Sequence, residues 1–360
     1  MTTEEKLNLI KEVGEEITTE EELRKLIESG TPMVAYDGFE PSGLIHLPQG
    51  LLRAVNINKM IKSGCKFKVL VADWHAWANH KLDGDLDKIR ITGQYFIEVW
   101  RASGMDLDNI EFVWGSDLVK QDGYWDLVMK IAVKNNLPRV IRTVQIMGRE
   151  ETDSLTASQI LYPLMQAADI FILGANITQL GMDQRKVNML AREIAEEVGY
   201  PKPIVVSHHM MLGLLPPDDK REGESGVDRA IRLKMSKSKP ESSIFMTDTK
   251  EDVERKISKA WCPEGVIEEN PVLEYCKYIV FEKTDKMLIE RPEKFGGNIE
   301  FLSYQDLEKA YLNKELFPLD LKNALAKYIN EFLQPVRDHF EKSPEAKRLK
   351  EQVESFKVTR

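Results

Sequence analysis

The chain is 360 residues long with a mass of 41.4 kDa, enough for two domains that each bury a core. Its 42% hydrophobic and 30% charged residues are typical of a globular protein, which excludes collagen-like and low-complexity chains, and no apolar run approaches the ~18–20 residues that span a bilayer. The net charge of −9 argues against a non-specific DNA coat but leaves room for a nucleic acid bound by a local basic face.

The first third of the chain has the pattern of a β-α-β unit. Thr19 and Glu22 form a capping-box sequence, after which apolar positions recur at helical spacing. A short strand, a loop, a helix and an apolar, β-branched run follow. In order, the pattern predicts helix, strand, loop, helix and strand over residues 19–29, 34–36, 37–43, 48–63 and 67–72. Two strands joined by one helix predict a parallel sheet.

The rest of the chain alternates between helical pattern and polar loop. Residues 85–150 are mainly helical, 204–207 predict a strand, and 215–243 form a long loop rich in Pro, Asp, Lys, Gly and Ser. From Thr249 the helical pattern continues to Arg360. We therefore expect an α/β fold in which a Rossmann-like parallel sheet contains a helical insertion and is followed by an all-helical domain.

This fold implies three units with an insertion and a long loop inside the second one. Their expected bounds are an N-terminal helical extension over 1–34, a Rossmann-like domain over 35–246 (insertion about 85–150, polar loop about 215–243), and a helical domain over 247–360.

The N-terminal sequence and the cysteines indicate a reducing compartment. The polar, acidic start of the chain is unlike a secretory or mitochondrial leader. Cys65, Cys262 and Cys276 are few, odd in number and never in Cys-x-x-Cys spacing, so we expect a cytoplasmic protein without disulfides or a zinc ribbon. His208 and His209 end a predicted strand with no carboxylate or cysteine cluster beside them in the sequence, so we expect no metal site there.

The loop after the first predicted strand is a candidate ligand site. It runs from Pro41 to Gly50, between a strand and a helix, where parallel sheets bind ligands and where helix N–H groups meet phosphate. Gly43 would let a ligand approach the backbone, and His46 could donate to a phosphate oxygen. The alternative is an ordinary loop histidine before a helix that starts with proline.

The polar loop carries a second candidate, Lys234-Met235-Ser236-Lys237-Ser238-Lys239-Pro240. Two lysines spaced by three in a mobile loop can close on a triphosphate and neutralise charge as it develops. The alternative is a solvated charge run, although the apolar residues that follow weaken that interpretation.

A third candidate is a polar stripe on an apolar helix. Tyr162, Gln166 and Asp169 fall at i, i+4 and i+7, so they share one face of the helix. Such groups are costly on an apolar helix unless something pairs with them, and a small polar ligand is one such partner. The alternative is a stripe that faces the solvent.

The polar loop contains the Lys-Met-Ser-Lys-Ser signature of class I aminoacyl-tRNA synthetases, letter for letter. The His46 loop resembles their His-Ile-Gly-His signature, with His46 at the first histidine, Pro48 at the glycine and Gln49 at the second histidine. Further segments give the chain, from about residue 4 to its end, a resemblance to tyrosyl-tRNA synthetases of the archaeal and eukaryotic type, with a C-terminal stretch closest to plant-like cytosolic forms. These segments begin at Tyr36, Leu161, Gly181, Lys294 and Gln334.

The resemblance implies a role for each matching residue. Tyr36 and Asp169 would hold the phenol hydroxyl of tyrosine, and Tyr162, Gln166 and Gln184 its ammonium group. His46, Lys234 and Lys237 would stabilise phosphate charge during catalysis. The implied ATP-binding residues are Gly38, Gly43, His46, Gln49, Asp183, Met211 and Ser236. Phe295 and Asp320 match positions that contact the first anticodon base of the tRNA.

The function that the resemblance implies is two-step aminoacylation: tyrosine and ATP give tyrosyl-adenylate, and tRNA(Tyr) then accepts the tyrosyl group. Mg²⁺ would arrive with ATP, the helical domain would bind the anticodon, and the chain would form a homodimer in the cytoplasm without a membrane. Two other classes remain open, another synthetase of this fold (above all tryptophanyl) and a non-catalytic tRNA-binding relative. The Tyr36 and Asp169 pair argues against the first, because an indole offers no hydroxyl, and Lys234 and Lys237 argue against the second.

Overall fold

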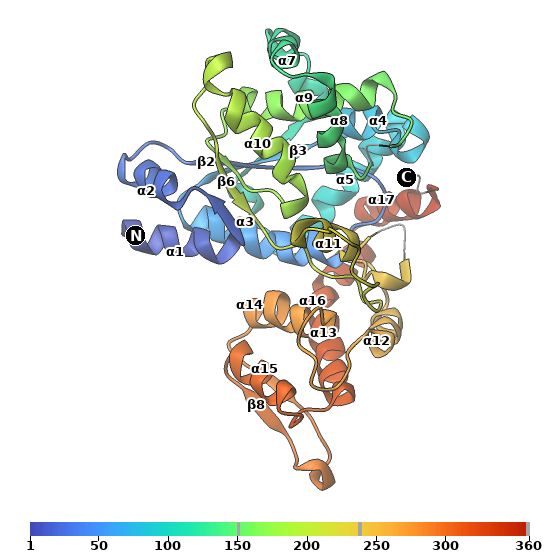
Figure 1. Ribbon diagram of the computed structural model, residues 1–360. Coiled ribbons are helices and arrows are strands. Elements are labelled where there is room, and N and C mark those ends of the chain that lie inside the picture. Colours follow the sequence, from blue (N-terminus) through green and yellow to red (C-terminus); the bar gives the residue numbers. More distant parts are fainter. Residues whose placement is uncertain (150–151, 237–239, 358–360) are drawn as a thin grey trace.

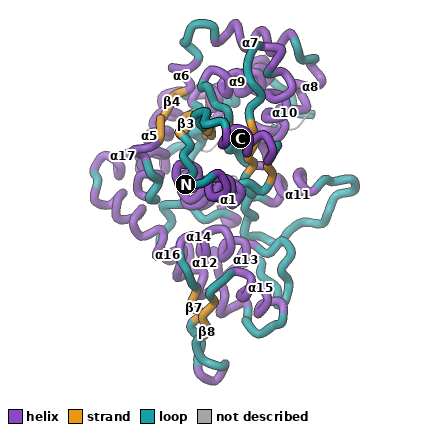
Figure 2. Tube along the Cα trace, turned by 90° about the vertical axis from the view of Figure 1, so that its left-hand side faces the viewer, coloured by secondary structure: helices purple, strands orange, loops and turns teal. Residues whose placement is uncertain are grey.

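The computed structural model describes residues 1–149, 152–236 and 240–357. Its core is a six-stranded sheet in the order β1-β6-β5-β2-β3-β4, in which β1 is antiparallel to β6 and the other neighbouring strands are parallel. The ribbon and tube views show helices on both sides of this sheet (Figure 1; Figure 2). The strands are β1 (Glu16–Thr18), β2 (Val34–Phe39), β3 (Lys66–Val71), β4 (Ile110–Trp114), β5 (Ile177–Thr178) and β6 (Ile204–Ser207). The α/β fold class predicted from the sequence is confirmed.

Helices connect and cover these strands. Up to β6 they are α1 (Thr3–Val13), α2 (Glu20–Glu28), α3 (Arg53–Lys62), α4 (Asp73–Ala78), α5 (Leu86–Ala102), α6 (Gly115–Leu118), α7 (Tyr124–Val133), α8 (Leu137–Thr143), α9 (Ala157–Ile172) and α10 (Arg185–Ile194). After β6 they are α11 (Gly226–Leu233), α12 (Lys250–Lys259), α13 (Pro271–Tyr275), α14 (Phe281–Lys283), α15 (Tyr304–Leu312), α16 (Pro318–Lys342) and α17 (Pro344–Ser355). None of the helices in the described ranges has the length and apolarity that a membrane crossing requires.

Local sequence signals account for the elements that the sequence predicted best. The side chain of Thr19 accepts from the Glu22 amide, and the Glu22 carboxylate accepts from the Thr19 amide, so the predicted capping box starts α2. The strand predicted over 67–72 is β3, which pairs with β2 and β4 along its two edges. The helix predicted from Pro48 is a π-helical turn over Pro48–Leu52 that continues as α3.

Four strands lie where the sequence predicted only helices. β1 stands within the N-terminal extension, β4 within the helical insertion, and the antiparallel pair β7 (Met287–Ile289) and β8 (Ile299–Phe301) within the C-terminal segment, which is therefore not all-helical. β1, β7 and β8 have only three residues each, too few for a periodic signal. β4 is a half-exposed edge strand and lacks the continuous apolar run of a central one.

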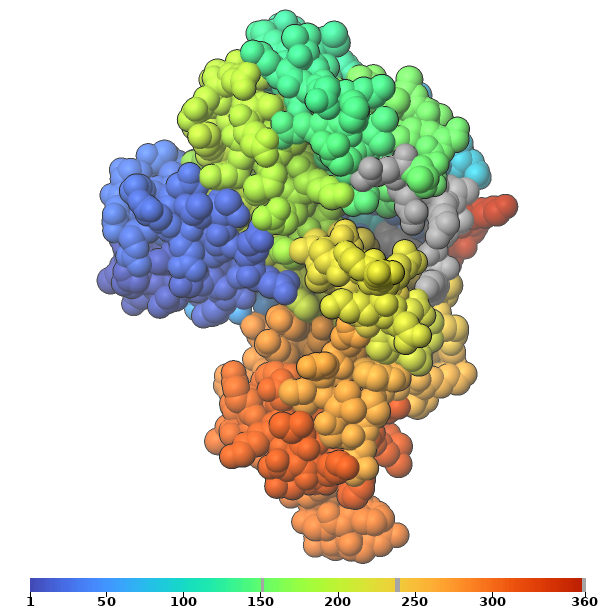
Figure 3. All heavy atoms as spheres, in the orientation of Figure 1, coloured from blue at the N-terminus to red at the C-terminus, as the bar shows by residue number. Residues whose placement is uncertain are grey.

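One part of the segment after residue 247 projects away from the sheet, and its last helix packs back against the sheet-containing part. The part coloured orange, which includes β7 and β8, projects away from the sheet and narrows to a tip (Figure 3). α12 packs on α16, and α17 packs back on α5 of the sheet-containing part. The predicted boundary near residue 247 stays a prediction, because helices on both sides of it share one apolar core.

Candidate active site

A cavity of about 300 Å³ opens at the carboxyl ends of the parallel strands. From β2 the sheet continues through β3 and β4 on one side and through β5 and β6 on the other. The strand order therefore reverses at β2, and in open parallel sheets ligands bind in the crevice at such a point. Residues 36–39 of β2, Ala72 after β3, His208 after β6 and one face of α9 line the cavity.

The cavity brings together most of the residues that the sequence predicted for a site. Gly43 and Ser236 are not in its wall, and Lys237 lies outside the described residues. The predicted residues that line it are Tyr36, Gly38, His46, Gln49, Tyr162, Gln166, Asp169, Asp183, Gln184, Met211 and Lys234. Their proximity is observed, and their individual roles stay predictions.

The polar stripe of α9 forms one wall of this cavity. Tyr162, Gln166 and Asp169 are 5%, 7% and 0% exposed, so the alternative of a stripe facing the solvent is wrong. Gln166 Nε2 donates to Gln184 Oε1 at 3.1 Å, and Gln184 Nε2 donates to the Ile146 carbonyl at 2.8 Å. The α9 face and Gln184 thus make a continuous polar wall that suits a small polar ligand.

The two carboxylate oxygens of Asp169 differ in their contacts. Oδ1 accepts a 2.7 Å hydrogen bond from the hydroxyl of Tyr124, on α7. Oδ2 lies 3.0 Å from Nε2 of His75, but that N–H is not aligned with it for a hydrogen bond. Within the described part of the chain, no donor is hydrogen-bonded to Oδ2. Because a buried carboxylate oxygen without a donor is costly, this atom is prepared to accept one from a ligand.

Burial and charge set the protonation of the groups around Asp169. Burial, followed by the charge of Asp169, raises the pKa of the Tyr36 hydroxyl well above its ordinary value. Burial and the neighbouring Glu40 do the same for the pKa of Tyr162. Burial disfavours the charged form of His75, yet its contact with Asp169 raises the pKa of the imidazole. The two phenols are therefore neutral hydrogen-bonding groups, whereas the contact with Asp169 favours the charged form of His75.

A buried network that the sequence did not predict lies beside the cavity. Arg53, 2% exposed at the start of α3, forms an ion pair with Asp37 of β2. Its Nη2 donates to Gln179 Oε1 at 2.6 Å, and its Nη1 lies 3.0 Å from Nδ1 of His208. Burial and the Arg53 charge lower the pKa of His208 well below its ordinary value, so the ring is neutral. Since Nδ1 accepts from Arg53, the ring proton is on Nε2.

Burial also acts on Asp37. It raises the pKa of the carboxyl to about 6, although Arg53 opposes the shift, and Oδ1 of Asp37 accepts a 2.8 Å hydrogen bond from the Gly38 amide. The network therefore connects the ends of β2, β5 and β6 with the start of α3. No local signal in the sequence could have revealed it, because its members come from distant parts of the chain; Arg53 and His208, for example, lie 155 residues apart.

The His46 loop and the lysine segment both contribute to the cavity wall. His46 forms an antiparallel bridge with Phe245, and its Nδ1 accepts a long 3.4 Å hydrogen bond from the Gln49 amide. Lys234 pairs through its backbone with Leu212, and its Nζ lies 2.5 Å from Oδ2 of Asp183. A cation and an anion that the resemblance assigns to nucleotide binding thus neutralise each other across the cavity.

His209 contacts two carboxylates that come from distant parts of the chain. Its Nδ1 lies 3.2 Å from Glu15, its Nε2 lies 3.2 Å from Glu274, and its ring stacks on Tyr278 with centroids 4.3 Å apart. Burial opposes the charge, but the two carboxylates raise the pKa of His209 to about 9. Across the described residues, no group of three or more His, Cys, Asp or Glu has an arrangement that could hold a metal ion.

The two residues predicted to contact an anticodon lie far from the cavity. Phe295, 54% exposed, follows β7 in the turn toward β8. The segment that contains β8 lies at the far end of the molecule from β3 and α9 (Figure 1). Arg291 donates to the Gly297 carbonyl at 3.0 Å and to the Glu315 carbonyl at 3.1 Å, which joins this turn to the segment before α16. Asp320 lies in the first turn of α16. An exposed ring in this position is available for stacking on a base.

The parallel sheet, its cavity at the point of reversal and the lysine segment beside it are the features of the class I tRNA synthetases. The chain matches the model of the family described as "tRNA synthetases class I (W and Y)" over residues 28–334. It is 49% identical over 360 residues to the cytoplasmic tyrosine--tRNA ligase 1 of Arabidopsis thaliana, an alignment that covers 99% of this chain and 90% of the relative.

Two further relatives agree with this match. The tyrosine--tRNA ligase of Saccharolobus islandicus is 42% identical over 363 residues, and both chains are fully covered. The crystal structure of tyrosyl-tRNA synthetase from Pyrococcus horikoshii, complexed with L-tyrosine, superposes with a TM-score of 0.90 at 37% identity and covers 98% of this chain and 100% of that chain. The chain belongs to the class I tRNA synthetases and, within them, to the tyrosine--tRNA ligases.

Proposed function

We propose that the chain activates L-tyrosine with Mg-ATP and transfers the tyrosyl group to the 3′-terminal adenosine of tRNA(Tyr). The observation that carries this proposal is the buried carboxylate of Asp169, whose Oδ2 accepts no hydrogen bond from a described residue in the cavity wall. A phenol hydroxyl supplies that donor, whereas phenylalanine and tryptophan bring no hydroxyl. The names of the relatives and the L-tyrosine in the Pyrococcus horikoshii crystal structure support the same substrate.

Tyrosine recognition uses the two ends of the α9 face. Asp169 accepts from the substrate hydroxyl, and the neutral Tyr36 phenol is its second partner there. Tyr162, Gln166 and Gln184 bind the ammonium group with oxygen acceptors. Asp169 lies nearly one turn beyond Gln166 on α9, so hydroxyl and ammonium sites are spaced along one side of the ligand.

Activation then proceeds by displacement at phosphorus. An oxygen of the tyrosine carboxylate forms a bond to the α-phosphorus of ATP, the bond from that phosphorus to the bridging oxygen breaks, and pyrophosphate leaves with its magnesium. His46, Lys234 and Lys237 stabilise the charge that develops on the phosphates, and no side chain becomes a covalent nucleophile. The ribose binds Asp183, which releases Lys234 from its ion pair for the phosphates.

The remaining assigned residues surround the nucleotide. Those with backbone or packing contacts to ATP are Gly38, Gly43, Gln49, Met211 and Ser236. In the second step, a terminal adenosine hydroxyl of the tRNA attacks the carbonyl of tyrosyl-adenylate, loses its proton and expels AMP. Positioning and electrostatics supply the rate acceleration in both steps.

The tRNA and a second copy of the chain are the macromolecular partners. Phe295 stacks on the first anticodon base, Asp320 hydrogen-bonds it, and the segment over 247–360 acts as the anticodon-binding unit after the catalytic unit over 35–246 and the extension over 1–34. α7 and α8 expose an apolar group that suits a homodimer interface: Trp125, Met129, Val133 and Leu137. The name of the Arabidopsis relative supports a cytoplasmic location.

Amino-acid-dependent exchange of pyrophosphate into ATP tests this function. Purified protein is incubated with Mg-ATP, labelled pyrophosphate and one amino acid at a time. Tyrosine alone is expected to support fast exchange, and tRNA(Tyr) is then expected to accept labelled tyrosine. Exchange with tryptophan instead would indicate the other specificity of the family, and tRNA binding without any exchange would indicate a non-catalytic relative.

A further inference from the structure

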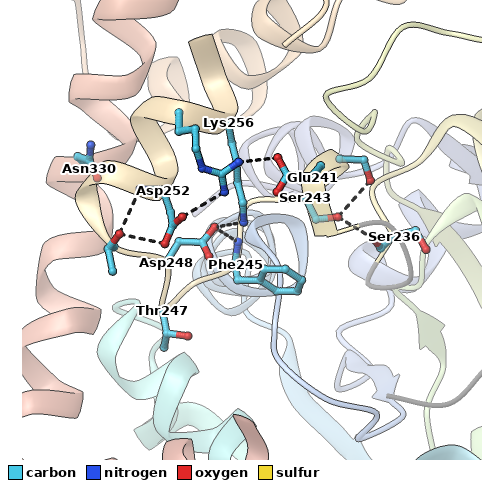
Figure 4. A network of polar contacts seen from close by, with 12 residues as sticks. Ser236, Glu241, Ser243, Phe245, Thr247, Asp248, Asp252, Lys256 and Asn330 are labelled. Carbon is cyan, nitrogen blue, oxygen red and sulfur yellow. Dashed lines mark hydrogen bonds and ion pairs between the residues drawn. The ribbon is translucent and has the colours of Figure 1, made fainter. Parts of the chain in front are cut away.

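A buried lysine outside the cavity holds the backbone against which the His46 loop is paired. Lys256, on α12, is 5% exposed, and its Nζ donates to Oδ2 of Asp248 at 2.6 Å. The same oxygen accepts the Phe245 amide at 2.9 Å, and the ammonium lies 4.9 Å from the centre of the Phe245 ring. Lys256 therefore contacts both ends of the turn from residue 245 to 248, as Figure 4 shows.

This turn is also joined to the catalytic loop. The Leu47 amide donates to the Ile244 carbonyl at 2.8 Å, and the Met246 amide donates to the Ile45 carbonyl at 2.9 Å. These two bonds stand on either side of His46, so its backbone position depends on where residues 244–246 lie. The helical turn after His46 is in close contact as well, because a Cβ added at Gly50 would come within 2.2–2.7 Å of the Met246 side chain.

Residues 243–248 further connect the lysine segment with α16. The Ser243 hydroxyl donates to the Ser236 carbonyl at 2.8 Å, next to the end of the Lys234 segment. At the other end, Arg337 of α16 donates from Nε to the Asp248 carbonyl at 2.8 Å and from Nη2 to Asn330 Oδ1 at 2.6 Å. One short segment thus touches both catalytic loops and the long C-terminal helix; Figure 4 shows its contact with Ser236.

We propose that Lys256 is a positioning residue for tyrosine activation, which holds residues 244–248 so that His46 keeps its place in the cavity wall. The inference rests on the function proposed above. Stability alone does not require a charged pair here, since buried ion pairs are often replaced by apolar residues without loss. The contacts of Lys256 explain why a charged residue stands here, because an ammonium group can bind the carboxylate of Asp248 and the ring of Phe245 at the same time. A misplacement of ~1 Å in a catalytic group can cost ~10²-fold in rate.

The test replaces the ammonium and follows two kinetic constants in tyrosine-dependent pyrophosphate exchange. Lys256→Met keeps the length of the stem but removes the charge, and it is expected to lower kcat by ~10²-fold while the KM for tyrosine stays within twofold. The tyrosine KM is expected to stay unaffected because the described polar and ring contacts of Lys256 are with Asp248 and Phe245, which do not belong to the α9 or β2 wall. Lys256→Arg restores a cation within reach of Asp248 and is expected to recover most of the kcat.

The chain supplies a matched control on the same helix. Lys259 is exposed on α12, so Lys259→Met is expected to behave like the parent chain in both constants. If Lys256→Met does not give folded protein, Asp248→Asn takes its place, since it keeps an oxygen for the Phe245 amide but removes the charge that binds Lys256.

Two results would overturn the inference. The first is a parent-like kcat in folded Lys256→Met protein. The second is a common loss of kcat, tyrosine affinity and thermal stability that arginine does not restore, because such a lysine is structural only. A parent chain that shows no tyrosine-dependent exchange contradicts the proposed function instead, so the two failures are distinguishable.

Discussion

Replacing Asp169 with asparagine tests the separate roles of the two oxygens of this carboxylate. The amide has nearly the same shape, and its oxygen can still accept the hydrogen bond of the Tyr124 hydroxyl. The other position becomes an NH₂ group, which cannot accept a hydrogen bond from the substrate. The substitution also removes the largest influence that raises the pKa of His75, so burial then favours the neutral ring.

The magnitude follows from the single bond that is lost. A hydrogen bond to a charged acceptor contributes ~1.5–3 kcal/mol, and each ~1.4 kcal/mol corresponds to a factor of ten. We therefore expect kcat/KM for tyrosine to fall by ~10- to 150-fold. Phenylalanine forms no bond to this oxygen, and in the parent it leaves Oδ2 buried without a donor. The kcat/KM for phenylalanine should therefore stay constant or rise. The ratio of kcat/KM for tyrosine to that for phenylalanine should then fall by at least the factor by which kcat/KM for tyrosine falls.

Pyrophosphate exchange with tyrosine and with phenylalanine measures both constants on one protein preparation. Asp73→Asn is the matched control, because Asp73 is also a fully buried carboxylate but does not line the cavity. Its Oδ1 accepts the Ser116 amide at 2.8 Å, so the control is expected to lower stability and leave the ratio of the two substrates unchanged. An unchanged ratio in folded Asp169→Asn protein would refute the assignment of Oδ2 to the substrate hydroxyl.

Three further predictions concern other parts of the chain. The pKa of His209 is raised from 6.5 to about 9, which corresponds to ~3 kcal/mol of folding stability. This stability is fully present below pH ~6.5 and is lost as the pH rises through about 9. The unfolding free energy of the His209→Gln variant, measured against pH, should lack this decline. Phe295→Ala should raise the KM for tRNA(Tyr) by the equivalent of ~1–3 kcal/mol and leave pyrophosphate exchange intact; a loss of both would make the ring structural. Lys237→Ala should raise the activation free energy of single-turnover adenylate formation by ~2.7–4 kcal/mol without weakening tyrosine binding. A parent-like rate would show that this lysine has no catalytic role.

The sequence could predict those features whose cause is local. The capping box of α2, the β-α-β order of β2, α3 and β3, and the shared face of Tyr162, Gln166 and Asp169 all follow from residues a few positions apart. Helical spacing alone placed the three side chains on one face, and the cost of leaving them unpaired pointed that face toward a ligand. The parallel sheet then located the ligand at the carboxyl ends of its strands.

The partners of these residues could not be predicted in the same way, because they come from distant parts of the chain. Tyr124 lies 45 residues before Asp169, and Arg53 lies 155 residues before His208. His209 contacts Glu15, which lies near the start of the chain, and Glu274, which lies in α13. Such contacts depend on how strands are ordered in the sheet, which a single sequence does not state. The short strands β1, β7 and β8 escaped prediction for the related reason that three residues have no measurable period.

Both loops that carry the assigned catalytic residues are held by charged groups from beyond residue 247. Lys256 of α12 holds residues 245–248, which pair with the His46 loop. Glu274 of α13 accepts the Leu212 amide at 2.9 Å, and Leu212 pairs in turn with Lys234. Buried hydrogen bonds to a carboxylate are directional, so each loop has a fixed position only when the C-terminal helices are packed against the sheet. The geometry of the proposed activation step is therefore set jointly by the sheet and by helices of the segment that we propose to bind tRNA.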